Sequence, residues 1–121
     1  VKTAFDPLLA RKIYAGADMF LMPSQSEPCG LAQMFAMRYG TIPIVRETGG
    51  LRDTVRDNGN NDGNGFTFKA YNALDMIDAM HRAMKAFDDK DLWTSLVKRA
   101  MKYDFSWDAS AETYLNLYEK L

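Results

Sequence analysis

The feature that most constrains the fold is an apolar segment that leads through a glycine-containing loop into an amphipathic segment, and the chain contains it twice. Met19–Met22 is apolar and stops at Pro23, and after the loop 24–31 apolar residues recur near helical spacing. Residues 42–45 lead in the same way into the turn 47–51. Each unit predicts a strand, a loop and a helix, an order that favours a parallel sheet with helices on both faces.

The rest of the chain predicts one α/β domain over residues 1–121, with three parallel strands at 19–22, 42–45 and 65–68. This is a partial Rossmann-like sheet, because a doubly wound domain normally has more strands on the N-terminal side. Pro43 argues against a fully hydrogen-bonded central position for the second strand, unless the neighbouring strand does not need the amide that proline lacks. The helix after the third strand is expected to bury one apolar face, made of Leu74, Ile77, Met80, Met84 and Phe87.

The loop before the second helix predicts a site for an anion beside a carboxylate. Pro28 suits the first helical turn, and the free amides of Cys29, Gly30 and Leu31 would then point out of the helix start. A phosphate would be repelled by Glu27, so this carboxylate is expected to accept hydrogen bonds from hydroxyl groups. The side chain of Cys29 is interpreted as a small buried packing group, with catalysis by its thiol as the minor alternative.

Several residue strings resemble bacterial glycogen synthase and plant starch synthase. The strings are Arg11-Lys12-Ile13-Tyr14-Ala15-Gly16-Ala17-Asp18, Glu27-Pro28-Cys29-Gly30-Leu31-Ala32-Gln33, Ala36-Met37-Arg38-Tyr39-Gly40-Thr41-Ile42-Pro43-Ile44-Val45-Arg46, Thr48-Gly49-Gly50-Leu51, Asp53-Thr54-Val55 and Phe105-Ser106-Trp107. The resemblance covers essentially the whole chain. It implies a GT-B enzyme with two facing Rossmann-like domains, of which residues 1–121 would form the last part of the donor-binding domain. The N-terminal acceptor domain would then be absent.

The resemblance also implies roles for individual residues. Glu27 would be the catalytic residue that contacts the glucose of the nucleotide sugar, and Cys29, Gly30 and Leu31 would bind the donor. Thr48 and Gly49 join this donor site, because both loops leave the carboxyl ends of strands, where such folds bind ligands. Many related enzymes carry a second glutamate eight residues after the first, for the ribose. The chain has Phe35 at that position.

Phe5 and Arg46 keep two readings each, and His81 has one. Phe5 is either stapled onto Leu9 at the start of the first helix or is a stacking platform for the donor's base. Arg46 is either a solvated charge or part of the cleft, with the cleft favoured. His81 is interpreted as structural, because the sequence contains no metal-binding cluster that includes it.

Composition excludes several classes of function. The net charge of −1 provides no basic field for nucleic acid or for an anionic membrane, and no apolar run approaches the length of a membrane span. No metal or cofactor is expected. The single cysteine fits a reducing compartment, here the cytoplasm, or a plastid for a plant protein. The opening residues 1–5 do not form a signal peptide and lack an initiator methionine, which suits a chain cut from a larger one.

The parent protein is therefore predicted to be a retaining glucosyltransferase that extends an α-1,4-glucan from ADP-glucose or UDP-glucose. The isolated chain is predicted to be inactive and to self-associate through its unpaired sheet edge or its last helix. That helix carries an apolar stripe, expected to pack across an interface, of Ala111, Tyr114, Leu115, Tyr118 and Leu121. The alternatives are another GT-B transferase, of the sucrose or trehalose-phosphate synthase type, or a non-catalytic binding or assembly module.

Overall fold

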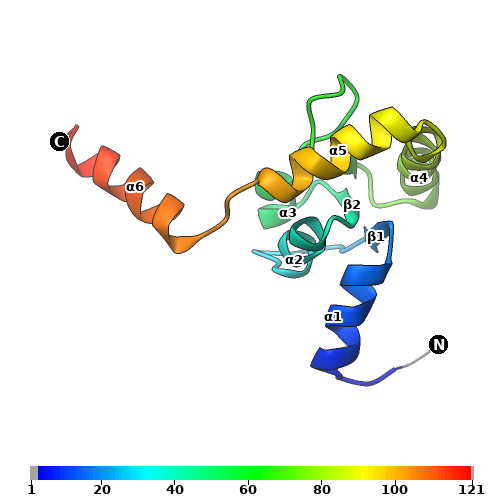
Figure 1. The fold of residues 1–121 in the computed structure, drawn as a ribbon, viewed down its shortest axis with the longest axis horizontal. Helices are drawn as coiled ribbons and strands as arrows, with labels where there is room; N and C mark the ends of the chain where they lie inside the picture. Colours follow the sequence, from blue (N-terminus) through cyan, green and yellow to red (C-terminus); the bar gives the residue numbers. More distant parts are fainter. Residues whose placement is uncertain (1–2, 121) are drawn as a thin grey trace.

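The computed structural model describes residues 3–120 as alternating helices and strands (Figure 1). In chain order the elements are α1 (Pro7–Gly16), β1 (Met19–Met22), α2 (Ala32–Tyr39), β2 (Ile42–Arg46), α3 (Gly49–Thr54), β3 (Phe66–Phe68), α4 (Ala73–Asp88), α5 (Lys90–Lys102) and α6 (Trp107–Tyr118). None of the described helices is long and apolar enough to cross a membrane.

The three strands form one parallel sheet in the order β1-β2-β3, as predicted. Met19 of β1 pairs with Ile42 of β2, and Ile44 of β2 pairs with Phe66 of β3. Residues 42–45 are all buried, and successive side chains of a strand point to opposite faces of the sheet. Both faces are therefore covered, which confirms an α/β sheet flanked by helices.

Pro43 does not displace β2 from the centre of the sheet, because the neighbouring strand does not need the amide that proline lacks. β3 pairs with β2 only from Ile44 onward, so on that side the ladder begins after the proline. An apolar segment such as Met19–Met22 predicts a buried strand, but Leu21 of β1 is 38% exposed and its neighbours are half-buried. The reason is position: β1 lies at the edge of the described sheet, with one side unpaired.

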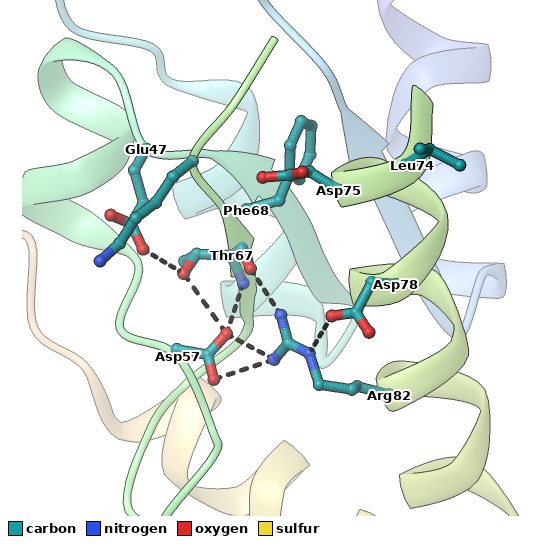
Figure 2. Close-up of a pocket in the computed structure, with 9 residues that line it drawn as sticks. Glu47, Asp57, Thr67, Phe68, Leu74, Asp75, Asp78 and Arg82 are labelled. Carbon is teal, nitrogen blue, oxygen red and sulfur yellow. Dashed lines mark hydrogen bonds and ion pairs between the residues drawn. The ribbon is translucent and has the colours of Figure 1, made fainter. Parts of the chain in front are cut away.

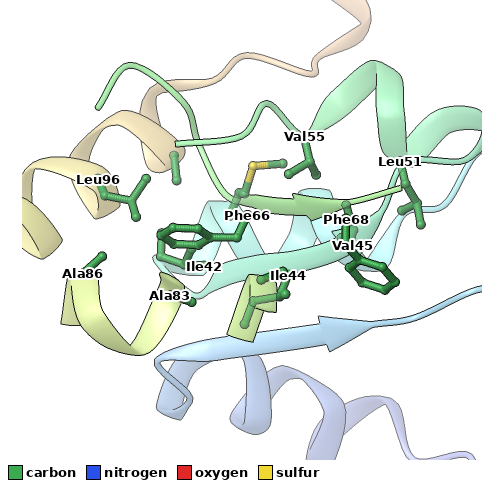
Figure 3. Close-up of a cluster of buried hydrophobic side chains, with 13 residues drawn as sticks. Ile42, Ile44, Val45, Leu51, Val55, Phe66, Phe68, Ala83, Ala86 and Leu96 are labelled. Atoms are coloured by element: carbon green, nitrogen blue, oxygen red, sulfur yellow. The ribbon is translucent and has the colours of Figure 1, made fainter. Parts of the chain in front are cut away.

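The core lies between the sheet and α4 and α5 and is filled by branched and aromatic side chains such as Ile44, Phe66 and Leu96 (Figure 3). The predicted buried face of α4 is wrong. Leu74 is 80% exposed, and the face that is buried consists of Ala79, Ala83 and Ala86. Small side chains let the helix backbone approach the strands closely, so larger residues on the same helix are turned outward. The exposed or half-buried apolar residues of α4 include Ile77, Met80, Met84 and Phe87.

α6 stands away from the rest of the chain (Figure 1). None of its residues is buried, and Trp107 at its start is 87% exposed. Tyr114, Leu115 and Tyr118 are likewise exposed, whereas Leu121 lies outside the described residues. The predicted apolar stripe is thus present on α6 without a partner among residues 3–120, and its packing across an interface stays a prediction.

Candidate functional site

The two predicted loops meet directly at the carboxyl ends of β1 and β2. The amide of Gly50 donates to the carbonyl oxygens of Glu27 and Pro28, both at 3.1 Å. A Cβ atom on Gly49 would lie 2.0 Å from the carbonyl oxygen of Glu27, and one on Gly50 would lie 2.1 Å from that of Cys29. Any side chain at either glycine would force the loops apart. The pair of glycines is therefore what allows the two loops to form one site.

The first loop ends differently from the prediction. α2 begins at Ala32 with Leu31 as its N-cap, so Pro28 and Cys29 precede the helix instead of starting it. Gly30 has a φ of +73°, a left-handed conformation that interrupts the helical path between Pro28 and Leu31. Cys29 is exposed, so its interpretation as a buried packing group is wrong. Its backbone carbonyl, by contrast, accepts a hydrogen bond from the buried side chain of Gln33 at 3.3 Å.

The loop nevertheless presents groups that suit a charged sugar donor. The amides of Gly30 and Leu31 have no hydrogen-bond acceptor within the described part of the chain. The carboxylate of Glu27 is half-buried and has neither an ion-pair partner nor a hydrogen-bond partner among residues 3–120. Free N–H groups attract an anion, and a free carboxylate accepts hydrogen bonds from hydroxyls. The two kinds of group lie within five consecutive residues.

The second loop contributes Thr48 and Gly49. Thr48 is the N-cap of α3, and its side chain makes no capping hydrogen bond. Its hydroxyl is therefore not used to cap the helix. Gly49 has a φ of +45°, which is strained for any other residue and consistent with its contact to Glu27. α3 has six residues and contributes little dipole, so the second loop serves mainly to support the first.

Phe5 is not brought together with these residues. Its side chain is 96% exposed and packs on no neighbour, which rules out the staple onto Leu9. The start of α1 is held instead by Asp6, whose side chain accepts from the Leu9 amide at 3.0 Å. The role of Phe5 as a stacking platform stays a prediction. His81 is exposed on α4, and we assign it no role in the candidate site.

Arg46, at the end of β2, is half-buried and partly engaged. Its Cζ lies 5.6 Å from the ring centroid of Tyr71, a cation–π geometry. Its Nε is buried and has no hydrogen-bond partner within the described residues. Arg46 is therefore not a simply solvated charge, and it lies at the same strand end as the turn at Thr48.

A polar network that the sequence did not predict connects α4 and β3 with Glu47, the residue before the second loop (Figure 2). Arg82 of α4 donates to both carboxylate oxygens of Asp57, at 2.8 and 3.0 Å, and to the carbonyl oxygen of Thr67 at 2.7 Å. The Thr67 hydroxyl contacts Glu47 Oε1 at 2.7 Å, and Glu47 directly precedes Thr48. These residues lie at one pocket with Phe68, Lys69, Leu74, Asp75 and Asp78. Asp57 and Arg82 are 25 positions apart, so no local pattern announces the contact.

The ionisation of Asp57 follows from this network. Burial alone would raise the pKa of the Asp57 carboxyl, but hydrogen bonds from Arg82 and from the Thr67 amide outweigh it and hold the pKa below the usual value. For Arg82 burial would lower the pKa, and the hydrogen bonds to Asp57 and Asp78 raise it instead. Both groups are therefore charged at neutral pH, and the pair acts as a fixed support for β3 and the turn beside it.

Comparison with known proteins places this geometry in a family. Residues 9–102 match the family described as glycosyl transferases group 1. The chain belongs to this family. Among its relatives, the glycogen synthase of Kosmotoga olearia is 56% identical over 95% of the chain, and that of Bacillus cereus strain B4264 is 54% identical over 100% of it. The chain covers 25% and 26% of these two proteins, respectively.

A solved structure gives the same result at the level of the fold. The catalytic domain of Starch Synthase IV from Arabidopsis thaliana, bound to ADP and acarbose, superimposes with a TM-score of 0.87 at 44% identity. The match covers 97% of this chain and 25% of that structure. The resemblance to glycogen and starch synthases and the partial Rossmann-like sheet are therefore confirmed. The chain spans about a quarter of the length of the relatives that it matches.

Proposed function

We propose that the protein containing this chain transfers glucose from a nucleotide sugar to the non-reducing end of an α-1,4-glucan, with retention at the anomeric carbon. The observation that carries this proposal is the first loop itself. It holds an unpartnered carboxylate, Glu27, within a few residues of the free amides of Gly30 and Leu31. A nucleotide sugar presents the complementary groups, sugar hydroxyls next to a diphosphate.

The chemistry requires that the leaving diphosphate be stabilised while the sugar becomes oxocarbenium-like. The loop amides and the start of α2 supply positive partial charge for the diphosphate. Glu27 accepts hydrogen bonds from the glucose hydroxyls and holds the sugar in position. The Gly50 amide holds the first loop from the neighbouring strand. Thr48 and Gly49 bind the donor beside it, and Phe5 stacks on the base of the nucleotide.

The donor is proposed to be ADP-glucose, supported by the relative that was solved with ADP bound. UDP-glucose is the competing donor, and measuring glucose transfer from each of the two nucleotide sugars distinguishes them. No cofactor is proposed. The cytoplasmic location expected from the sequence, or a plastid for a plant protein, remains a prediction.

Residues 1–121 are proposed to be the last part of a donor-binding domain, with the glucan acceptor bound by a second domain. Three features support this: the coverage of about a quarter of each relative, the unpaired side of β1, and α6 without a partner in the described residues. Each leaves a surface that a larger protein would cover.

The test is glucose transfer by the longer protein that contains this chain, from ADP-glucose or UDP-glucose to glycogen. Glu27→Ala is expected to lower turnover about 100- to 1,000-fold, the loss typical of one transition-state hydrogen bond, while thermal stability stays close to the parent. Asp62→Ala, which removes an exposed carboxylate in the surface loop 57–64, is the control and should keep full turnover. A Glu27→Ala enzyme within a factor of two of the parent would refute the role of Glu27. Absence of transfer from either donor by the parent would refute the function.

A further inference from the structure

The buried side chain of Gln33, in the first turn of α2, joins the two loops of the candidate site. Gln33 is 0% exposed. Its Nε2 donates to the carbonyl oxygen of Gly30 at 2.9 Å and lies 3.3 Å from that of Cys29. It also donates to Thr54 Oγ1 at 3.1 Å, across 21 positions of the chain. One amide group thus contacts the first loop and the helix that follows the second.

These contacts close a ring of hydrogen bonds. The Thr54 hydroxyl donates to the carbonyl oxygen of Gly50 at 2.7 Å, and the Gly50 amide returns to the carbonyl of Glu27. The ring therefore runs from Gln33 through Thr54 and Gly50 back to the loop whose carbonyls Gln33 holds. Its members are fixed by one another, as expected for a connected polar network in a buried site.

Peptide geometry converts these contacts into a direction for two amides. A trans peptide is planar, and its C=O and N–H point in opposite directions; the described chain contains no cis peptide. Because the carbonyl of Cys29 faces Gln33, the amide of Gly30 points away from it. The carbonyl of Gly30 faces Gln33 in the same way, so the amide of Leu31 also points away. Both amides lack an acceptor among the described residues.

A second observation concerns the oxygen of the Gln33 side-chain amide. Its Oε1 is buried without a hydrogen-bond partner in the described structure, which is unfavourable for a polar atom. A Cβ on Gly30 would lie 2.6 Å from this oxygen, so the orphaned atom points at the loop. A side chain that only filled space here would be apolar and would leave no such oxygen.

We propose that Gln33 is a positioning residue, which aims the amides of Gly30 and Leu31 at the diphosphate of the donor. The inference rests on the proposed function for the identity of the anion. It adds to that function a residue that never touches the donor and acts through two carbonyl groups. Methionine has nearly the same length and shape as glutamine but cannot donate, so Gln33→Met removes the positioning while keeping the volume.

The experiment follows the backbone amides of the full 121-residue chain by ¹H–¹⁵N NMR during titration with inorganic pyrophosphate. In the parent, the resonances of Gly30 and Leu31 are expected to shift at millimolar pyrophosphate. In Gln33→Met these two shifts should need at least tenfold more pyrophosphate, while the resonance of the core residue Val45 stays in place. Gln25→Met, exposed in the same loop, is the matched control and should behave as the parent.

Two results would overturn the proposal: pyrophosphate binding of equal strength in Gln33→Met, or parent shifts that bypass Gly30 and Leu31. If Gln33→Met fails to fold, Thr54→Val replaces it. This variant removes the contact that fixes the Gln33 amide group from α3 and keeps both carbonyl contacts. It should therefore weaken pyrophosphate binding measurably but by less than tenfold, and unchanged binding would count against Gln33. The glucose-transfer assay is read separately. If the parent transfers no glucose but Gln33→Met weakens pyrophosphate binding as expected, only the proposed function is refuted. If the parent transfers glucose but Gln33→Met binds pyrophosphate as the parent does, only the role of Gln33 is refuted.

Discussion

The amide nitrogen of Gly50 lies 3.1 Å from the carbonyl oxygen of Glu27, so the turn after β2 is hydrogen-bonded to the loop after β1 at the residue proposed to hold the glucose. The contact exists because Gly49 and Gly50 have no side chains that would separate the two loops. The position of Glu27 is therefore set by a turn more than twenty residues away. This relationship leads to the first prediction.

Gly50→Ala should destabilise the protein by about 1–3 kcal/mol, because its methyl group would lie 2.1 Å from the carbonyl oxygen of Cys29. Donor binding should weaken as well, since the first loop must move. Gly16→Ala is the control: nothing lies within 4 Å of its added methyl group, and alanine favours a helix. Chemical denaturation of both variants measures the difference, and equal stability of the two would show that the loops do not pack as described.

Asp57 should make stability depend on pH. Its pKa is lowered in the folded state, so it contributes stability above the unfolded value near 4, and this contribution is lost as pH falls through the lower folded value. Asp57→Asn should cost about 1 kcal/mol at pH 7, a modest figure because the pair with Arg82 is about one third exposed. The gap to the parent should shrink on acidification.

Urea unfolding of the parent and Asp57→Asn at several pH values between 3 and 7 measures this gap. Asp62→Asn, at an exposed position in the same loop, controls for the change in net charge. A gap between parent and Asp57→Asn that stays constant down to pH 3 would contradict the assignment.

The 121-residue chain alone should not transfer glucose. Positioning of two reactants supplies about 7–11 kcal/mol of rate enhancement in enzymes, and we propose that a second domain positions the acceptor. A helix start contributes about 0.3–2 kcal/mol toward an anion, whereas millimolar binding requires about 4 kcal/mol, so donor binding should be millimolar or weaker. Radiolabelled transfer from ADP-glucose to glycogen by this chain, abolished in Glu27→Ala, would disprove the expectation.

The chain should self-associate at high concentration. β1 has an unpaired side, and α6 exposes Trp107, Tyr114 and Leu115 without a partner in the described structure. Light scattering of the parent and of a chain truncated after residue 104 separates the two routes. Loss of association on truncation assigns it to α6, and its persistence assigns it to β1. A monomer in both samples at high concentration would show that neither surface drives association.

The sequence by itself determined the parts of this protein that depend on neighbouring residues. The strand–loop–helix order predicted three parallel strands, and all three are found. The cap at Asn72 with Asp75 was also predictable, and the Asn72 side chain accepts from the Asp75 amide at 2.8 Å. Such features depend on only a few consecutive residues, so the local sequence pattern is enough to predict them. The residue strings of the first loop were specific enough to indicate the family.

Only the tertiary structure decided which surfaces meet. Periodicity shows that α4 has an apolar stripe, but the close approach of the sheet selected Ala79 and Ala83 over the larger residues. The left-handed conformation of Gly30 goes with a start of α2 at Ala32 instead of Pro28, and Cys29 is exposed. The network of Arg82 and the ring through Gln33 join residues more than twenty positions apart. Their geometry depends on how the sheet brings the loops together, and no local pattern in the chain encodes that distance.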